Sequence, residues 1–282
     1  LVLKNNKGTE DNRVRRMDYS IQISKLFYER FMNEGDITLI SPHMAPGLYE
    51  AFGTDEFDDL YLKYEADKTI PKKTVPAQDL FFDLLKERAE TGRIYIMNLD
   101  HCNSHSSFKD KVSMSNLCQE ITLPTTPIQD IHDEQGEIAL CILSAVNVGS
   151  LNDLSELQNI CDLSVRALEQ IIDYQDYPVK AAEVSTKKRR SLGIGYIGLA
   201  HYLAKNGVKY SDPKAWDLVD RLTEAFQYNL LRASCNIAME KGKCEGFERT
   251  KYADGLLPID HYKKEIDEIV PHKQRMAWES LR

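Results

Sequence analysis

The run AQDLFFDLLKERAETGRIYIMN, residues 77–98, places a predicted helix directly before a predicted strand. Residues 77–92 follow Pro76 and close on Gly92, and both positions are typical of helix boundaries. Residues 93–98 form a short apolar run, as expected of a strand. A helix that leads into a strand is typical of the α/β class.

The same alternation continues along the chain, with loops predicted at residues 98–107 and 124–136. Asp212 is suited to cap a helix whose first position is Pro213. Strands alternating with helices predict an α/β fold, in an open sheet or a barrel. The further helices are predicted at residues 17–35, 151–174 and 212–242, and the further strands at 36–41, 116–123, 137–148 and 189–197.

The composition is that of a soluble globular protein, with 42% hydrophobic and 28% charged residues in 282. A net charge of -8 gives no basic surface for a nucleic acid. No apolar run approaches the roughly 20 residues that span a bilayer. Scattered cysteines argue against a secreted disulfide scaffold, so we expect a cytoplasmic protein. The six are Cys102, Cys118, Cys141, Cys161, Cys235 and Cys244.

Two motifs have a functional and a purely structural interpretation. Gly193, Gly195 and Gly198 match the spacing of a dinucleotide fingerprint, but the polar STKKRRS before them is a poor buried strand. We favour a strand-to-helix junction, with an NAD-dependent oxidoreductase as the alternative.

DHCNSH, residues 100–105, could supply zinc ligands. No second ligand pair completes a site, so we predict no metal there and a turn held by hydrogen bonds.

The stretch SNLCQEI, residues 115–121, spaces an amide, a thiol and a carboxylate two residues apart. If it is extended, Asn116, Cys118 and Glu120 share one face. A carboxylate on a buried face is costly without a partner, so the three would line a polar pocket. The alternative is that Cys118 and Cys141 are small buried apolar residues.

Such a trio suits radical chemistry better than hydrolysis, because an attacking thiolate usually relies on a histidine base. A thiyl radical can take a hydrogen atom from a carbon that bears a hydroxyl. A nearby carboxylate can remove the proton of that hydroxyl, while an amide binds a neighbouring hydroxyl. Cys141, on a separate predicted strand, would fit as one thiol of a reducing dithiol pair.

Several longer phrases, in this order, resemble the catalytic large subunit of class Ia ribonucleoside-diphosphate reductase. The resemblance covers essentially the whole chain. Phrases that carry it include LVLKNNKGTEDNRVRRMDY, TGRIYIMNLDHCNSH, SNLCQEITLPTTP, GEIALCILSAVNVGS and RRSLGIGYIGLAHYLAKNG, which begin at residues 1, 91, 115, 136 and 189.

The resemblance implies a role for each residue of the trio. Cys118 would become the transient thiyl radical that abstracts the 3′ hydrogen of the ribose. Glu120 would act as the base for the 3′ hydroxyl, and Asn116 would bind the sugar hydroxyls. Cys141 would be one half of the redox pair that reduces the 2′ position. Substrate-binding residues would be Asn116, Leu117, Glu120 and Leu143.

The resemblance also implies the fold: part of a ten-stranded α/β barrel whose central finger loop carries Cys118. Residues 1–282 would be a single piece of this catalytic domain. The chain opens on Leu1 rather than Met, so we expect a piece of a longer polypeptide. The N-terminal ATP cone, the effector loops and the C-terminal part of the barrel would lie outside it.

The implied activity reduces ribonucleoside diphosphates to 2′-deoxyribonucleoside diphosphates, as precursors of DNA. No cofactor would bind directly; the radical would come from a di-iron tyrosyl-radical small subunit, and ATP and deoxynucleoside triphosphates would act as effectors. Other implied partners are thioredoxin or glutaredoxin and a second large subunit. We expect neither a membrane nor a nucleic acid as partner. The alternative is a non-catalytic fragment of a split large subunit that is active only on assembly.

Overall fold

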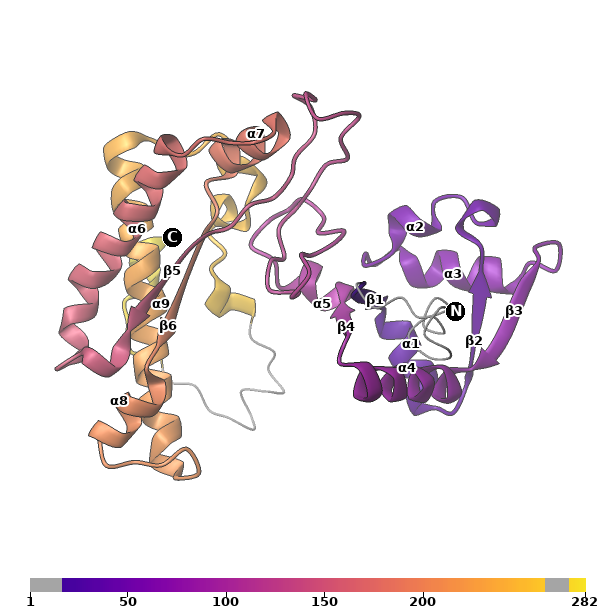
Figure 1. Ribbon diagram of the computed structural model, residues 1–282, viewed down its shortest axis with the longest axis horizontal. Helices are drawn as coiled ribbons and strands as arrows, with labels where there is room; N and C mark the ends of the chain where they lie inside the picture. Colours follow the sequence, from indigo (N-terminus) through magenta and orange to yellow (C-terminus); the bar gives the residue numbers. More distant parts are fainter. Residues whose placement is uncertain (1–16, 262–273) are drawn as a thin grey trace. The chain divides into compact units, whose positions relative to one another are not determined.

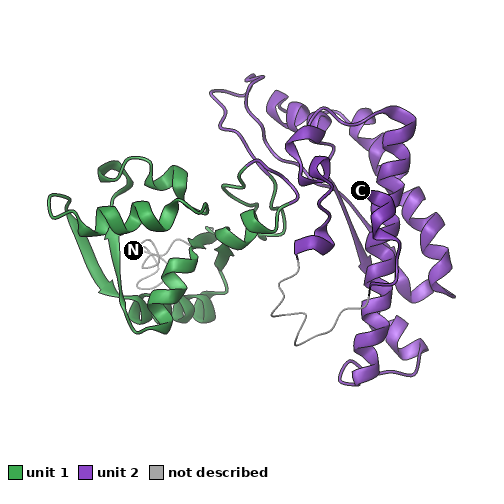
Figure 2. Ribbon diagram, turned by 180° about the vertical axis from the view of Figure 1, so that it is seen from behind, with its two compact units in different colours: residues 1–106, 111–123 green, residues 107–110, 124–282 purple. Residues whose placement is uncertain are grey.

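The computed structural model describes residues 17–261 and 274–282. The first phrase of the family resemblance therefore falls mostly, at residues 1–16, outside the described residues. The described residues form two compact units, which Figure 2 shows in two colours. Unit 1 contains residues up to 106 and 111–123, and unit 2 contains residues 107–110 and those from 124 onward.

Unit 1 is built from two pairs of strands and the helices that connect them (Figure 1). β1 (Tyr19–Ile23) pairs in parallel with β4 (Ile94–Asn98), and β2 (Asp36–Ile40) pairs antiparallel with β3 (Lys72–Pro76). The helices are α1 (Lys25–Met32), α2 (Leu48–Ala51), α3 (Phe57–Ala66), α4 (Ala77–Thr91) and α5 (Leu99–Ser104), with a 3-10 turn, η3, at Pro42–Met44.

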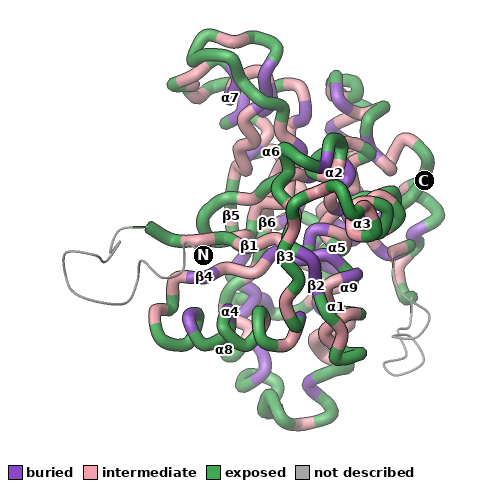
Figure 3. Tube along the Cα trace, turned by 90° about the vertical axis from the view of Figure 1, so that its right-hand side faces the viewer, coloured by how far each residue is buried: buried purple, intermediate pink, exposed green. Residues whose placement is uncertain are grey.

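The helix and strand predicted at residues 77–98 are confirmed as α4 and β4. Gly92 ends α4 with a φ of 67°, in the left-handed region that glycine adopts without steric cost. Ala77 and Leu84 are buried, whereas most of α4 is exposed or half-buried, as the tube in Figure 3 shows. The predicted strand at residues 36–41 is confirmed as β2.

The helix predicted at residues 17–35 is wrong in its first part, because residues 19–23 form strand β1. Ile21 and Ile23 alternate with polar side chains, and this period of two fits a strand that pairs with β4. Helix α1 begins only after Ser24, whose Oγ accepts a hydrogen bond from the backbone N of Phe27. Such a cap fixes the start of the helix.

The loop predicted at residues 98–107 is also wrong, since α5 occupies most of it. Leu99 is almost fully buried at its start. The Asn103 side chain donates to the carbonyl of Val112 at 3.0 Å and accepts from the amide of Val112 at 2.8 Å. These bonds join the helix to the segment that leads towards Cys118, and they keep a short helix in place.

Unit 2 packs helices against one parallel strand pair (Figure 1). β5 (Ile142–Asn147) pairs with β6 (Leu192–Ile197), with Ile142 opposite Leu192. The helices are α6 (Leu157–Tyr174), α7 (Lys180–Arg189), α8 (Leu199–Lys205) and α9 (Pro213–Lys241). The 3-10 turns are η4 (Val148–Ser150), η5 (Leu154–Glu156), η6 (Phe247–Arg249), η7 (Lys251–Asp254), η8 (Pro258–His261) and η9 (Trp278–Leu281).

Two long helices supply the core of unit 2. The prediction for residues 212–242 is confirmed as α9, and Asp212 caps it by accepting from the amide of Lys214 at 2.9 Å. The helix predicted at residues 151–174 begins later, as α6, because Asp153 caps the preceding 3-10 turn instead. Fully buried side chains from these helices include Leu157, Cys161 and Leu222.

The strands of unit 2 are shorter than predicted. The strand expected at residues 137–148 begins only at Ile142, and the one expected at 189–197 begins at Leu192. Arg190 has a φ of 48°, a left-handed conformation that ends α7 and precludes a strand there. Both parallel pairs have helices between their strands, so the α/β class is confirmed. None of the described helices is long and apolar enough to cross a bilayer.

Candidate functional site

The segment that carries Asn116, Cys118 and Glu120 is a tight turn in unit 1, so the strand predicted at residues 116–123 is wrong. The amide of Gln119 donates to the carbonyl of Asn116 at 3.2 Å, and Gln119 has a φ of 67°. A positive φ reverses the local direction of the chain, so the alternation of faces along a strand does not apply. The argument that the three side chains share a strand face therefore fails.

Polar side chains close this turn at its base. The Asn116 Oδ1 accepts from the amide of Ile121 at 3.0 Å, and the Ser115 Oγ donates to the carbonyl of Ile121 at 2.6 Å. The Gln119 side chain donates to the Ser20 Oγ at 3.0 Å, which fastens the turn to β1. The oxygen of the Asn116 amide is thus used within the turn, and its NH₂ group is the part suited to a ligand hydroxyl.

The tip of the turn is open. Cys118 and Glu120 are exposed, and Leu117 is 60% exposed. The expectation that Glu120 lies on a buried face is wrong, and the interpretation of Cys118 as a small buried apolar residue is equally wrong. An exposed carboxylate needs no partner to offset desolvation. The thiol and the carboxylate are both accessible to solvent.

Cys141 and Leu143 belong to unit 2, where Cys141 directly precedes β5 and Leu143 is the second residue of that strand. The Cys141 side chain is half-buried, and Leu143 is 62% exposed. Both side chains lie over Gly193 of the neighbouring strand β6, since a Cβ built there would meet each of them. Cys141 and Leu143 therefore share one face, as residues two apart on an extended segment do.

The glycine motif forms a strand-to-helix junction, as predicted. Gly193 and Gly195 lie inside β6, and Gly198 directly precedes α8 with a φ of 80°. A Cβ on Gly198 would lie 2.4 Å from the Oδ1 of Asn147, so the junction requires glycine. A dinucleotide fingerprint places its glycines in the turn after the strand, whereas two of these three are within the strand.

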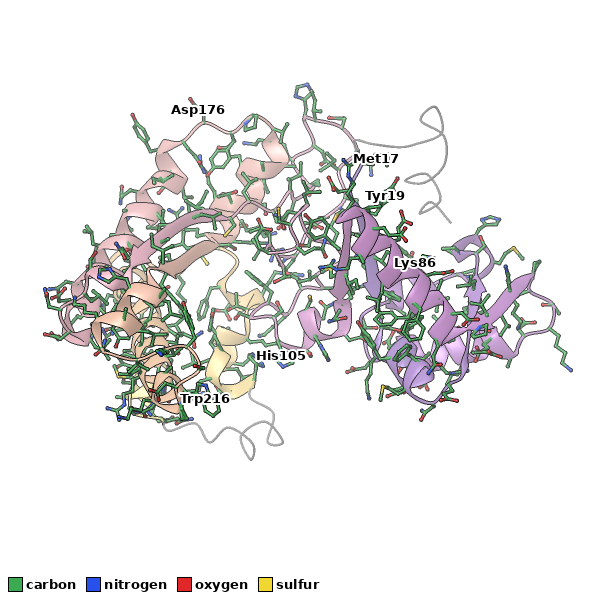
Figure 4. All side chains as sticks on the ribbon, turned by 60° about the horizontal axis from the view of Figure 1, so that its bottom comes forward. Met17, Tyr19, Lys86, His105, Asp176 and Trp216 are labelled. Carbon is green, nitrogen blue, oxygen red and sulfur yellow. The ribbon has the colours of Figure 1, made fainter. Side chains whose placement is uncertain are left out.

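Neither the histidine motif nor a surface pocket gathers the predicted site residues. His101 and Cys102 lie on α5, with His105 directly after it, and the described residues contain no group of three or more His, Cys, Asp or Glu side chains that could hold a metal ion. Trp216, which Figure 4 labels, is exposed, and it lines a pocket between α8 and α9. Its lining residues are Leu199, Leu203, Tyr210, Ala215, Trp216, Val219, Asp220 and Thr223.

A charged cluster in unit 2, which sequence reasoning missed, takes its two carboxylates from the segments that lead to Cys118 and Cys141. Arg189 at the end of α7 donates to the carboxylate of Glu137, and its Nη1 lies 2.8 Å from the Oδ2 of Asp110. Lys188 adds a bond of 2.7 Å to Glu137, and Arg249 donates to Asp110 at 2.8 Å. Arg189 and Glu137 are buried. We call these five residues the Arg189 cluster.

The Arg189 cluster holds both of its carboxylates in the ionised form. Hydrogen bonds from Arg249, followed by those from Arg189, lower the pKa of Asp110 from 3.8 to about 2. Burial would raise the pKa of Glu137, but hydrogen bonds from Arg189 and Lys188 outweigh it, and the pKa is lowered. Charge-assisted bonds of this kind are stronger than neutral ones.

A pH dependence of stability follows from Asp110. Its folded pKa lies below its ordinary value, so the stability it contributes is full above pH 3.8 and is lost as the pH falls towards 2. We expect Asp110→Asn to lower the melting temperature at neutral pH. The gap in melting temperature between the variant and the wild type should narrow below pH 3.8. Thermal unfolding by circular dichroism across this range measures the gap. A gap that stays constant down to pH 2 would contradict the assignment.

The amino-acid sequence also matches known proteins. All of residues 1–282 match the family model described as the ribonucleotide reductase barrel domain. The chain belongs to the ribonucleotide reductase family. The expected resemblance is confirmed, and the α/β class agrees with the barrel domain that the family model describes.

Relatives of the chain include alpha subunits of ribonucleoside-diphosphate reductase. It is 58% identical over 287 residues to ribonucleoside-diphosphate reductase subunit alpha of Haemophilus influenzae. It is 54% identical over 287 residues to ribonucleoside-diphosphate reductase 1 subunit alpha of Escherichia coli, and 43% identical over 290 residues to the alpha subunit of Enterobacteria phage T4. Each alignment covers 100% of this chain and 38% of the relative. The chain thus spans well under half the length of the curated relatives it matches.

Proposed function

We propose that the chain is one piece of the catalytic barrel domain of a class Ia ribonucleoside-diphosphate reductase large subunit. The observation that carries this proposal is the match over all 282 residues to the barrel-domain family. The open turn with Cys118 at its tip agrees with it, because a thiol that reacts with a substrate must be accessible. The ATP cone, the effector loops and the rest of the barrel belong to other parts of the complete subunit.

The proposed reaction begins at the open turn. A thiyl radical on Cys118 takes the 3′ hydrogen of the ribose, and Glu120 accepts the proton of the 3′ hydroxyl. Asn116 donates its NH₂ group to a sugar hydroxyl, because its oxygen is held by the backbone of Ile121. The exposed side chains of Leu117 and Leu143 provide apolar contact for the substrate.

The reduction step needs two electrons and two protons. In the proposal, Cys141 and a second cysteine thiol of the complete subunit supply both, and they end as a disulfide. The 2′ hydroxyl leaves as water and a hydrogen takes its place, and Cys118 returns the 3′ hydrogen to the sugar, which restores the thiyl radical. The half-buried position of Cys141 agrees with a thiol that reacts inside a site rather than with bulk solvent.

The partners are part of the same proposal. A small subunit with a di-iron centre and a tyrosyl radical delivers the radical, and thioredoxin or glutaredoxin reduces the disulfide. The large subunit forms a dimer that responds to ATP and deoxynucleoside triphosphates, and the complete enzyme works in the cytoplasm. The names of the relatives, which are alpha subunits, support the expectation of a second kind of subunit.

The test is formation of deoxyribonucleoside diphosphate, measured by chromatography. The complete polypeptide, with small subunit and a dithiol reductant, is expected to turn over. The chain of residues 1–282 alone is expected to give no product, because the second thiol and the rest of the barrel lie elsewhere. No product from the complete system would contradict the function. Turnover by residues 1–282 alone would contradict the proposal that they are only one piece.

A further inference from the structure

Gly193 stands directly opposite Leu143 in the parallel pair of β5 and β6. A Cβ at position 193 would lie 2.5 Å from the Sγ of Cys141 and 2.5 Å from the Cδ2 of Leu143. No real side chain tolerates such distances, so Cys141 and Leu143 occupy space that any residue other than glycine would fill. Two residues that we assign to the substrate site meet at this one glycine.

Gly195, two residues further along the same strand, is different. It stands opposite Ala145, and a Cβ built on Gly195 would meet nothing within 4 Å. The two glycines share a strand, a partner strand and an orientation relative to the sheet. Strand formation alone therefore does not explain why position 193 lacks a side chain.

We propose that Gly193 is a positioning residue for the Cys141 thiol. Its missing side chain leaves a recess in which the Sγ of Cys141 and the end of the Leu143 side chain lie side by side over β6. A methyl group there would displace both. The consequence for catalysis rests on the proposed function of Cys141, whereas the placement of the thiol does not.

The displacement would affect the site more than the fold. The atoms that a Cβ would meet are the ends of two flexible side chains, not backbone. Leu143 is 62% exposed and Cys141 is half-buried, so each has room to adopt another rotamer. The φ of Gly193 is not among the positive values in this chain, so alanine meets no backbone strain there.

The experiment compares Gly193→Ala with the matched variant Gly195→Ala in the complete reductase. Iodoacetamide labels the reduced protein, and peptide mass spectrometry gives the labelling rate of Cys141 relative to Cys118. We expect this ratio to change about threefold or more in Gly193→Ala alone, because the thiol adopts other rotamers. Deoxynucleotide formation should fall about tenfold or more in the same variant. A tenfold loss corresponds to a free-energy cost of about 1.4 kcal/mol for placing the thiol in its productive position.

The outcomes separate the inference from the function. A changed labelling ratio with unchanged turnover supports the positioning of the thiol and overturns the role of Cys141 in the reaction. An unchanged ratio in Gly193→Ala, or an equal change in Gly195→Ala, overturns the inference. Loss of folding in Gly193→Ala alone also overturns it, since only flexible side-chain ends oppose the methyl group.

Discussion

Cys118→Ser in the complete reductase is expected to abolish deoxynucleotide formation. A hydroxyl is far harder to oxidise by one electron than a thiol, so the variant cannot hold the unpaired electron that takes the 3′ hydrogen. The side chain is exposed at the tip of its turn, and the substitution leaves no cavity. We therefore expect the stability to stay within about 0.5 kcal/mol of wild type. Product formation and thermal unfolding, measured on one preparation, separate the two effects.

Cys141→Ser is the matched control, because it makes the same chemical change at the second proposed cysteine. It should permit the first step and stop the reduction. A substrate labelled with tritium at the 3′ carbon distinguishes the variants: Cys118→Ser is expected to release no label, whereas Cys141→Ser releases label without forming normal product. A near-normal rate in Cys118→Ser would remove the basis for the radical assignment.

The parts of the fold that sequence reasoning predicted correctly are those with strong local signals. Gly92 ends α4 and Asp212 caps α9 through interactions within a few residues of each position. The sequence predicts a helix where β1 lies, because Ile21 and Ile23 also fit the apolar face of the helix that follows. Only pairing with β4, more than 70 residues away in sequence, stabilises that segment as a strand.

The site shows the same division between local and distant causes. The identities of Asn116, Cys118 and Glu120 could be selected from the sequence, and their roles remain predictions. Their geometry could not, because the turn at Gln119 is also fastened by a hydrogen bond to Ser20 of β1, which lies 99 residues away in sequence. Residue types alone fit a strand and a turn equally well here. A two-residue spacing fixes a common face only after the backbone conformation is known.

The Arg189 cluster had no local signal at all. In sequence, KKRR is an ordinary polar helix end, and basic residues at a helix C-terminus are favourable in any case. Glu137 lies 52 residues and Asp110 lies 79 residues from Arg189.

Arg189→Met is expected to be the most destabilising single substitution among the described ion pairs. Removing one member of a buried charge network typically costs about 3–5 kcal/mol, because its partners stay buried without compensation. Lys188 and Arg249 continue to pair with Glu137 and Asp110, so we expect about 3 kcal/mol, the lower end of that range. Methionine retains much of the length and apolar packing of the arginine stem. Chemical denaturation of the complete protein measures the loss.

Arg166→Met is the matched control, because Arg166 also pairs with two carboxylates, Asp162 and Glu240, and the substitution removes the same charge. These side chains are at least one-third exposed, and a surface pair contributes about 1 kcal/mol or less. Adding Glu137→Gln to Arg189→Met should recover part of the loss, since the amide is cheaper to bury than a carboxylate. If Arg166→Met costs as much as Arg189→Met, or if Glu137→Gln recovers nothing, burial of the cluster is not what stabilises it. The segments that lead to Cys118 and Cys141 would then be held in place by some other contact.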